Sequence, residues 1–351
     1  MFNGLAEAVI HPHTGRMQRV TATDLRGKII DIHAHAGISV KAYANNEYPY
    51  AQSVEDLVYR HRANGVDAGV AFPFAPELHF NLPELIRSGV LAPTAAPISR
   101  APYSTENRVL MEEVGEFGFG TRILPFACIH PETAVNEQLE ELRNLTTSFP
   151  FYGIKVSPVL SQAPVLGLLG PGKPLLDFAA ELDVPVIVHV TVDPLERFSQ
   201  VADALTVTRA RPEIRFCLAH CAAFHRAYLE VAGELENVWV DTSALTIQTE
   251  ATFRNLRIMA TPEERLEADY SDHKSVMRSI CERFSDTMVW GSDSPAYTYI
   301  SRRLQGDGSY FDFRLKATYE DEKAALDALE SDIRFEIGSN NAIRLLFGVK
   351  T

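Results

Sequence analysis

Eight short runs rich in β-branched residues recur along almost the whole chain, and a longer polar stretch with helical periodicity follows each run. This alternation is typical of repeated βα units that build a parallel sheet. We expect strands at 28–35, 68–74, 122–129, 152–158, 185–191, 215–220, 238–243 and 287–293. We expect the main helices at 54–63, 107–117, 134–145, 175–182, 195–204, 226–235, 274–284, 320–330 and 332–346.

Eight strand–helix units in 351 residues predict an α/β fold of the (β/α)₈ TIM-barrel type. The barrel would form one domain over residues 1–351, with residues 1–27 as an N-terminal extension before the first strand. An open doubly wound sheet fits less well, because no G-x-G-x-x-G motif follows the first strand. Long stretches at 75–106, 244–272 and 294–319 have no clear helix, and in a barrel they lie as extended loops at the C-terminal face.

Charge and cysteine content argue against several classes of protein. The chain has 33 Lys+Arg against 46 Asp+Glu, a net charge of −13, which disfavours binding to nucleic acid and to anionic membranes. Its four cysteines show no C-x-x-C spacing, and no segment approaches eighteen uninterrupted apolar residues. We therefore expect a soluble, cytoplasmic protein that acts on a small-molecule substrate, without nucleic-acid or membrane partners. Whether it forms a homo-oligomer stays open.

The first strand ends in Asp31, His33 and His35. Because side chains alternate along a strand, we expect these three to share one face, opposite the apolar residues between them. Two imidazoles on one face can chelate a cation. The spacing alone is weak evidence, since His11 and His13 have it too, in a Pro- and Gly-containing turn.

Other predicted strands end in residues of the same chemistry. His189 ends the fifth strand, His220 the sixth and Asp293 the eighth. These residues, like the histidines of the first strand, would lie at the carboxyl ends of barrel strands, where this fold places active sites. Imidazole and carboxylate are the usual ligands of Zn²⁺ and also suit Mn²⁺, Fe²⁺ or Ni²⁺. The sequence therefore predicts one divalent-cation site.

The order H-x-H, H, H, D along the strands resembles the amidohydrolase superfamily of metal-dependent barrels. The similarity is greatest to the amidohydrolase-related branch that includes aminocarboxymuconate-semialdehyde decarboxylase. It runs from about residue 28 to 348 and rests on the phrases IDIHAH at 30–35, WGSDSP at 290–295 and GSNNAIRLLFG at 338–348.

The resemblance implies a ligand set. His33, His35, His189 and Asp293 would hold one ion, for which we expect Zn²⁺, and His220 would be a proton carrier or a ligand of a second ion.

Lys155 on the fourth strand leaves the number of ions open. In two-metal members of the superfamily, a lysine at this strand is carboxylated and bridges the ions. Lys155 could take that role. It could instead orient an anionic substrate as a charged ammonium, or it could be a structural lysine that points out of the barrel.

The resemblance implies hydrolysis of a C–N or C–O bond in a small, carboxylated organic substrate. A bound cation can lower the pKa of water from about 15.7 to about 7. Asp293 would accept the proton of the attacking water and pass it to the leaving group, and His220 would polarise the scissile carbonyl. Asp31 would accept a hydrogen bond from an imidazole or from a backbone amide beneath the site.

Four further residues near the predicted site match no ligand position. We expect His130 and Asp241 to have a structural or substrate-lining role rather than to bind metal. Arg302 and Arg303, in the loop after the eighth strand, could bind a substrate carboxylate through both guanidinium nitrogens, or could simply be solvated.

Three other functions compete with hydrolysis. The nearest is non-oxidative decarboxylation of an aromatic or muconate-like acid on the same metal site. A barrel-type deoxyribonuclease would be expected to have an acidic ligand on the fourth strand and a basic groove, so Lys155 and the net charge of −13 argue against it. The last is a barrel that has lost its metal and serves as a binding or scaffold protein.

Overall fold

The structure, a computed structural model, describes residues 18–304 and 310–349 except 45, 50, 117, 118 and 121. The side chains of residues 302–312 also lie outside the described part. His11 and His13 fall outside the described residues, so their predicted place in a surface turn stays a prediction.

All eight predicted strands are present, each somewhat shorter than expected. The third is divided at Phe126 into two segments, β6 and β7. The strands are β1 Ile30–His35, β5 Ala68–Phe72, β6 Ile123–Pro125, β7 Ala127–Ile129, β8 Ile154–Val156, β9 Val186–Val188, β10 Phe216–Leu218, β11 Val238–Asp241 and β12 Met288–Val289. They run parallel and in chain order, as β1-β5-β6 and β7-β8-β9-β10-β11-β12.

Backbone hydrogen bonds join these two sheets into a ring at both junctions. At the first junction, Phe126 N donates to Ala71 O on β5 at 2.9 Å. At the second, the segment after β12 pairs with β1 through bonds of 2.7–3.1 Å that link Ile32 to Trp290, His33 to Asp293, and His35 to Ser294. This closure agrees with the predicted TIM barrel, and it places the backbone of Asp293 directly beside that of His33.

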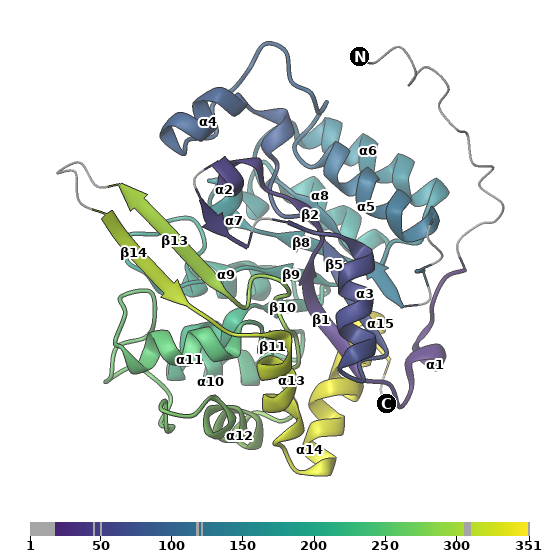
Figure 1. Cartoon of the computed structure of the whole chain (residues 1–351). Coiled ribbons are helices and arrows are strands. Elements are labelled where there is room, and N and C mark those ends of the chain that lie inside the picture. The colour runs from purple at the N-terminus through teal and green to yellow at the C-terminus, as the bar shows by residue number, and fades with distance from the viewer. Residues whose placement is uncertain are drawn as a thin grey trace.

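Helices surround the ring of strands (Figure 1). The helices that match predictions are α3 Val54–Ala63, α5 Ser104–Glu116, α6 Val135–Ser148, α8 Lys173–Glu181, α10 Arg226–Glu234, α12 His273–Arg283 and α13 Tyr319–Asp327. The predicted terminal helix consists of α14 Ser331–Phe335, the π-turn η4 Glu336–Asn340 and α15 Asn341–Phe347. Ser53 starts α3 by accepting a hydrogen bond from Asp56 N.

The predicted helix 195–204 is wrong in its first half, because α9 spans Val201–Ala210. The carboxylate of Asp193 does accept a hydrogen bond from Leu195 N at 3.0 Å, but it also binds Arg257 Nε at 2.8 Å. The chain then turns back, so that Thr191 bridges to Gln200. The helix begins only after this turn.

The long loops at the C-terminal face contain regular structure that the sequence analysis missed. The first of them holds η1 Glu77–His79 and α4 Leu82–Ser88, the second holds α11 Leu245–Phe253, and the third holds the hairpin β13 Tyr299–Leu304 and β14 Tyr310–Leu315. Smaller elements are α1 Ala22–Leu25, β2 Gly37–Ile38, α2 Val40–Ala44, β3 Glu47–Tyr48, β4 Ala51–Gln52, α7 Pro158–Ser161, η2 Val165–Leu169 and η3 His220–Phe224. Strand β13 pairs with β3, so the loops after β1 and β12 form one small antiparallel sheet.

Apolar side chains fill the inside of the barrel below the site. They include Ile30, Ile32, Val70, Phe72, Leu124, Phe126, Cys128, Ile187, Cys217, Trp239 and Val289. Val20 and Leu25 belong to the same buried cluster, as do residues of α15. The last part of the predicted extension 1–27 therefore packs on the barrel. Among the described helices, none combines the length and apolar character needed to cross a bilayer.

The prediction that Asp31 shares a face with His33 and His35 is wrong. The pairing register of β1 against β5 shifts between Asp31 and Ala34, and this irregularity breaks the simple alternation of faces. Ile30 and Ile32 pack inside the barrel, whereas Asp31 lies on the outer side, where its Oδ2 is 3.4 Å from Nε2 of His61 on α3.

Candidate metal centre

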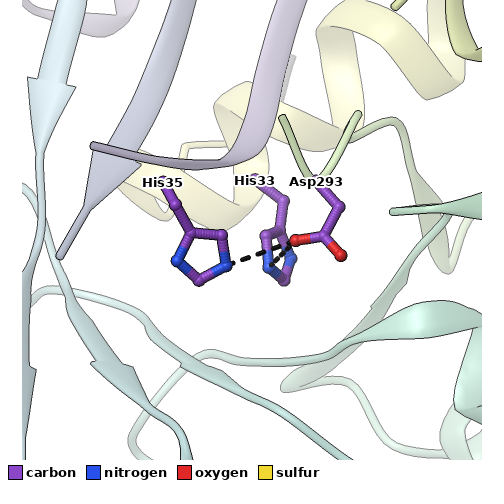
Figure 2. Close-up of side chains that lie close together, drawn as sticks. All are labelled: His33, His35 and Asp293. Carbon is purple, nitrogen blue, oxygen red and sulfur yellow. Dashed lines mark ion pairs between the residues drawn. The ribbon is translucent and has the colours of Figure 1, made fainter. Parts of the chain in front are cut away.

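His33, His35 and Asp293 bring three potential metal ligands together at the carboxyl end of the barrel. Asp293 Oδ1 lies 3.3 Å from Nε2 of each histidine, and one ligand atom from every residue lies within 4.8 Å of the others. All three side chains are buried. Figure 2 shows both imidazoles of β1 directed toward the carboxylate. Two imidazole nitrogens and a carboxylate oxygen are a common donor set for a divalent transition metal.

The state of Asp293 fits a bound cation. Its Oδ1 is buried and makes no hydrogen bond of normal geometry with the described residues, although buried oxygens are normally satisfied. Burial alone would raise the pKa of Asp293, but His33, His35 and His220 outweigh that effect and lower it. The carboxylate is therefore ionised and has a free oxygen facing two imidazoles. Its backbone is in the left-handed region, with φ 61°.

His33 is neutral, and its nitrogen that faces Asp293 is free of a proton. Burial, followed by the charge of Lys155, lowers its pKa to about 4. Its Nδ1 lies 2.7 Å from Asp241 Oδ2. An ionised carboxylate only accepts hydrogen bonds, so Nδ1 carries the ring proton and Nε2 keeps its lone pair toward Asp293.

His189 and His220 lie beside this cluster and contact each other. Nδ1 of His189 is 2.9 Å from Nε2 of His220, and the two ring centroids are 4.7 Å apart. His220 Nδ1 is 3.8 Å from Asp293 Oδ2, and the rings of His220 and His33 are 5.3 Å apart. Burial, followed by the neighbouring His220, holds the pKa of His189 well below its usual value. The predicted histidines thus converge at one rim.

Lys155 points into the barrel, so the alternative in which it faces outward is wrong. Its Nζ lies 3.2 Å from His33 Nε2 and 4.7 Å from the centre of the Phe72 ring, and the residue is 1% exposed. Burial lowers its pKa. The two roles at the site, as a carboxylated ligand or as a cation for an anionic substrate, both fit this position.

Asp31 connects β1 to the segment after β12 that carries Asp293. Its carboxylate accepts hydrogen bonds from Ser292 N at 2.9 Å, Ser292 Oγ at 2.6 Å and Tyr319 OH at 3.0 Å. It also accepts one from the backbone amide of His33 at 3.2 Å. The predicted contact with a backbone amide beneath the site is therefore present. The imidazole near Asp31 is that of His61, not that of a potential ligand.

Three further predicted residues follow β7 or belong to β13. His130 Nδ1 accepts hydrogen bonds from the backbone amides of Glu132 and Thr133, which is a structural role. Arg302 and Arg303 belong to strand β13 rather than to a loop, and their side chains lie outside the described part.

Asp241 has more contacts with the candidate site than its sequence position indicates. It is fully buried and contacts His33 through its side chain and His220 through the backbone amide, at 2.9 Å. Its position at the end of β11 is the signal in the sequence, and it predicts a structural or substrate-lining role for Asp241. Because Asp241 matches no motif position, the sequence does not show that it contacts His33 and His220.

A cavity of about 140 Å³ lies next to the site. Its walls include Ala36, Phe74, Glu77, Glu106 and Val109, and none of the potential metal ligands lines it. The ring of Phe74 stacks on His35 with the centroids 4.8 Å apart and so stands between the two. The cavity is a neighbour of the metal centre, not part of it.

Comparison with known protein families shows which family the chain belongs to. The family model described as Amidohydrolase matches residues 30–348, most of the chain. The chain belongs to the amidohydrolase family. Amidohydrolases are metal-dependent enzymes, which confirms the predicted family, enzyme class and need for a metal. No curated protein matches the sequence of this amidohydrolase.

Solved structures share the fold of this amidohydrolase at low sequence identity. A 2,6-dihydroxybenzoate decarboxylase in complex with 2,6-dihydroxybenzoate is 15% identical with a TM-score of 0.55, over 91% of this chain and 98% of that one. A TIM-barrel protein from Bordetella bronchiseptica gives the same values. Amidohydrolase 2 from Bifidobacterium longum subsp. infantis is 14% identical with a TM-score of 0.50, over 91% and 98%. These similarities confirm the predicted TIM-barrel fold.

Proposed function

We propose that this amidohydrolase hydrolyses a C–N or C–O bond in a small organic substrate that carries a carboxylate. The observation that supports this most strongly is the buried Asp293 Oδ1, which has no hydrogen-bond partner among the described residues and faces Nε2 of both His33 and His35. A buried carboxylate oxygen that lacks a hydrogen-bond donor is well suited to bind a cation. Family membership supports hydrolysis at such a site.

His33, His35 and Asp293 would hold the ion, with His189 as the fourth ligand. Three imidazoles and one carboxylate make Zn²⁺ our choice of metal, since this donor set is common in catalytic zinc sites. A divalent ion at such a site lowers the pKa of water to about 7 and polarises a carbonyl oxygen. The burial of the donors keeps bulk water from competing for them.

Asp293 and His220 would handle the protons. Asp293 is ionised and turns Oδ2 toward His220, 3.8 Å from Nδ1 of that ring. Oδ2 can therefore accept the proton of the attacking water and return it to the leaving group. His220 faces Oδ2 of this carboxylate, whereas His35 faces Oδ1, and once it has taken up a proton its imidazolium can stabilise the oxyanion that develops on the substrate.

The charges around the site favour an anionic substrate. Asp241 and Asp293 both have lowered pKa values and are ionised, and a divalent ion would balance them. The buried ammonium of Lys155 would then be in excess, and a substrate carboxylate would neutralise it. Arg302 and Arg303 of β13 are our candidates for a second contact with that carboxylate.

Non-oxidative decarboxylation of an aromatic or muconate-like acid is the second candidate. It uses the same donors and the same preference for a carboxylate. The fold similarity to a 2,6-dihydroxybenzoate decarboxylase over 91% of the chain supports it.

One experiment distinguishes the two reactions. The protein is stripped of metal, reloaded with Zn²⁺ and incubated in H₂¹⁸O with carboxylated amides and esters and with aromatic acids. Hydrolysis places ¹⁸O in the acid product, whereas decarboxylation releases CO₂ and places no ¹⁸O in the remaining product. Asp293→Asn should abolish either activity. Turnover that is equal with and without metal would contradict both proposals.

A further inference from the structure

We infer that Asp241 is a positioning residue that determines which ring nitrogen carries the proton in His33, His220 and His189. The inference rests on the proposed metal site, because proton placement decides which nitrogens can bind a metal. Asp241 is 0% exposed and lies at the end of β11, which pairs with β10 on one side and with β12 on the other. Its two carboxylate oxygens serve two separate chains of hydrogen bonds.

The first chain has one step. Asp241 Oδ2 lies 2.7 Å from His33 Nδ1. The carboxylate can only accept, so the imidazole must donate from Nδ1. Nε2 is then left with a lone pair, and this is the nitrogen 3.3 Å from Asp293 Oδ1. A carboxylate that holds the far nitrogen of a metal-binding histidine is a widespread way of setting its tautomer and ring orientation.

The second chain runs through Ser243 to two further rings. The hydroxyl of Ser243 donates to Asp241 Oδ1, so its oxygen can only accept from His220 Nδ1, at 3.0 Å. The carbonyl of Ser243 also faces that nitrogen, at 3.2 Å. His220 Nε2 therefore has the lone pair, and it accepts from His189 Nδ1 at 2.9 Å. The remaining nitrogen, His189 Nε2, is left free of a proton.

The direction of every bond in both chains thus follows from one buried anion. Backbone amides of His220 and Ser243 also donate to Asp241 Oδ1, at 2.9 and 3.0 Å, and hold the carboxylate in place. Cys217 Sγ donates to Asp241 Oδ2 at 3.8 Å, so both carboxylate oxygens act as acceptors. Because His220 Nε2 accepts from His189, this pattern favours His220 as a proton carrier over a ligand of a second ion.

The first test reads the tautomers of the unaltered protein. Two-bond ¹H–¹⁵N correlation spectra distinguish an imidazole protonated at Nδ1 from one protonated at Nε2. We expect His33, His189 and His220 all to be protonated at Nδ1, in the metal-free protein and with Zn²⁺ bound. An Nε2-protonated His33 or His220 in the metal-free protein would overturn the inference, whatever the protein binds.

The second test uses Asp241→Asn, with Glu322→Gln as a matched control. Glu322 is also a buried carboxyl, 1% exposed, but it contacts the α11 amide of Thr246 instead of the site. The asparagine side chain replaces one of the two acceptor oxygens by an NH₂ group. This group donates a hydrogen bond where Asp241 accepts one, so the donors and acceptors of one of the two hydrogen-bond chains are reversed. We expect Zn²⁺ affinity, measured by competition with a chromophoric chelator, to fall 10- to 100-fold in Asp241→Asn and to change less than twofold in Glu322→Gln.

The outcomes separate this inference from the proposed function. If Asp241→Asn does not fold, the tautomer spectra of the unaltered protein decide. If the variant folds with unchanged tautomers and unchanged affinity, the inference is wrong while the metal site stands. If the unaltered protein binds no divalent ion, the proposed function fails, and the tautomer pattern is still judged by its own spectra.

Discussion

One residue next to the potential ligands, Gly291, is constrained by space. Gly291 precedes the Ser292–Asp293 segment, and a Cβ built on it would lie 2.7 Å from Cβ of His33. That distance is shorter than real contacts between such atoms, so any side chain here must displace the strand that carries the histidines. The phrase around Asp293 is recognisable in the sequence, but this contact is not, because it joins residues far apart along the chain.

Gly291→Ala should therefore weaken the metal site. We expect Zn²⁺ affinity to fall at least tenfold, because His33 moves relative to Asp293, together with a loss of about 1–3 kcal/mol in the free energy of unfolding. Gly233→Ala is the matched control, since its nearest neighbour would be Phe284 at an ordinary 3.6 Å. Chelator competition and thermal unfolding measure both variants. Equal affinity in the two would show that the contact at Gly291 is not important.

Glu322 predicts a pH-dependent stability. Burial raises its pKa to about 8 from an ordinary 4.5. The folded protein therefore keeps this proton while the unfolded chain loses it, so the stability linked to Glu322 is greatest at low pH and falls as the pH rises from about 4.5 to 8. Glutamine does not ionise, so Glu322→Gln should lack this loss in the free energy of unfolding. We expect the pH-dependent part of the difference between the two proteins to reach about 4 kcal/mol at pH 8 and to be almost zero at pH 4.5. Urea unfolding across this range measures it. A difference between the two proteins that is constant with pH would contradict the account.

At the scale of elements, the turn after β10 is the least predictable from sequence. Residues His220–Phe224 all have φ between 47° and 60°, although none is glycine. A left-handed backbone costs about 1–2 kcal/mol for each such residue. All five residues are buried. The turn directs His220 toward Asp293 and His189, so tertiary packing imposes a conformation that local propensity opposes.

Glycine should be tolerated in this turn far better than in a helix. We expect Ala222→Gly to be neutral or stabilising, because glycine adopts φ 47° freely and offsets the lost methyl contact. In Ala232→Gly, an equally buried alanine of α10, we expect a loss of about 1–2 kcal/mol. Chemical denaturation of both variants provides the comparison. A similar loss in the two would mean that the turn is not strained.

The other elements that escaped the sequence analysis have identifiable causes. Helix α11 is buried at Leu245, Ile247 and Ala251 and also at two threonines, so it lacks one clear apolar stripe. The irregularity in β1 depends on its pairing with β5, which no local pattern encodes. The β13–β14 hairpin gains its third strand from β3, about 250 residues away.

For the whole molecule, the alternation of strand and helix segments in the sequence is sufficient to predict the barrel. The rule that active sites lie at the carboxyl ends of the strands is sufficient to predict that the histidines lie close together. What could not be derived is how those side chains connect. The sequence predicts a structural or substrate-lining role for Asp241, but not that its side chain contacts His33 and the backbone amide of His220. The predicted single domain over 1–351, the homo-oligomer and the cytoplasmic location stay predictions.

The most direct test of the account is anomalous diffraction at the zinc absorption edge, on crystals of the protein reloaded with Zn²⁺. We predict a peak about 2.0–2.2 Å from Nε2 of His33 and of His35 and from a carboxylate oxygen of Asp293. A crystal that shows no peak there, or a zinc ion held only by other residues, would contradict the claim that these strand ends form the metal centre.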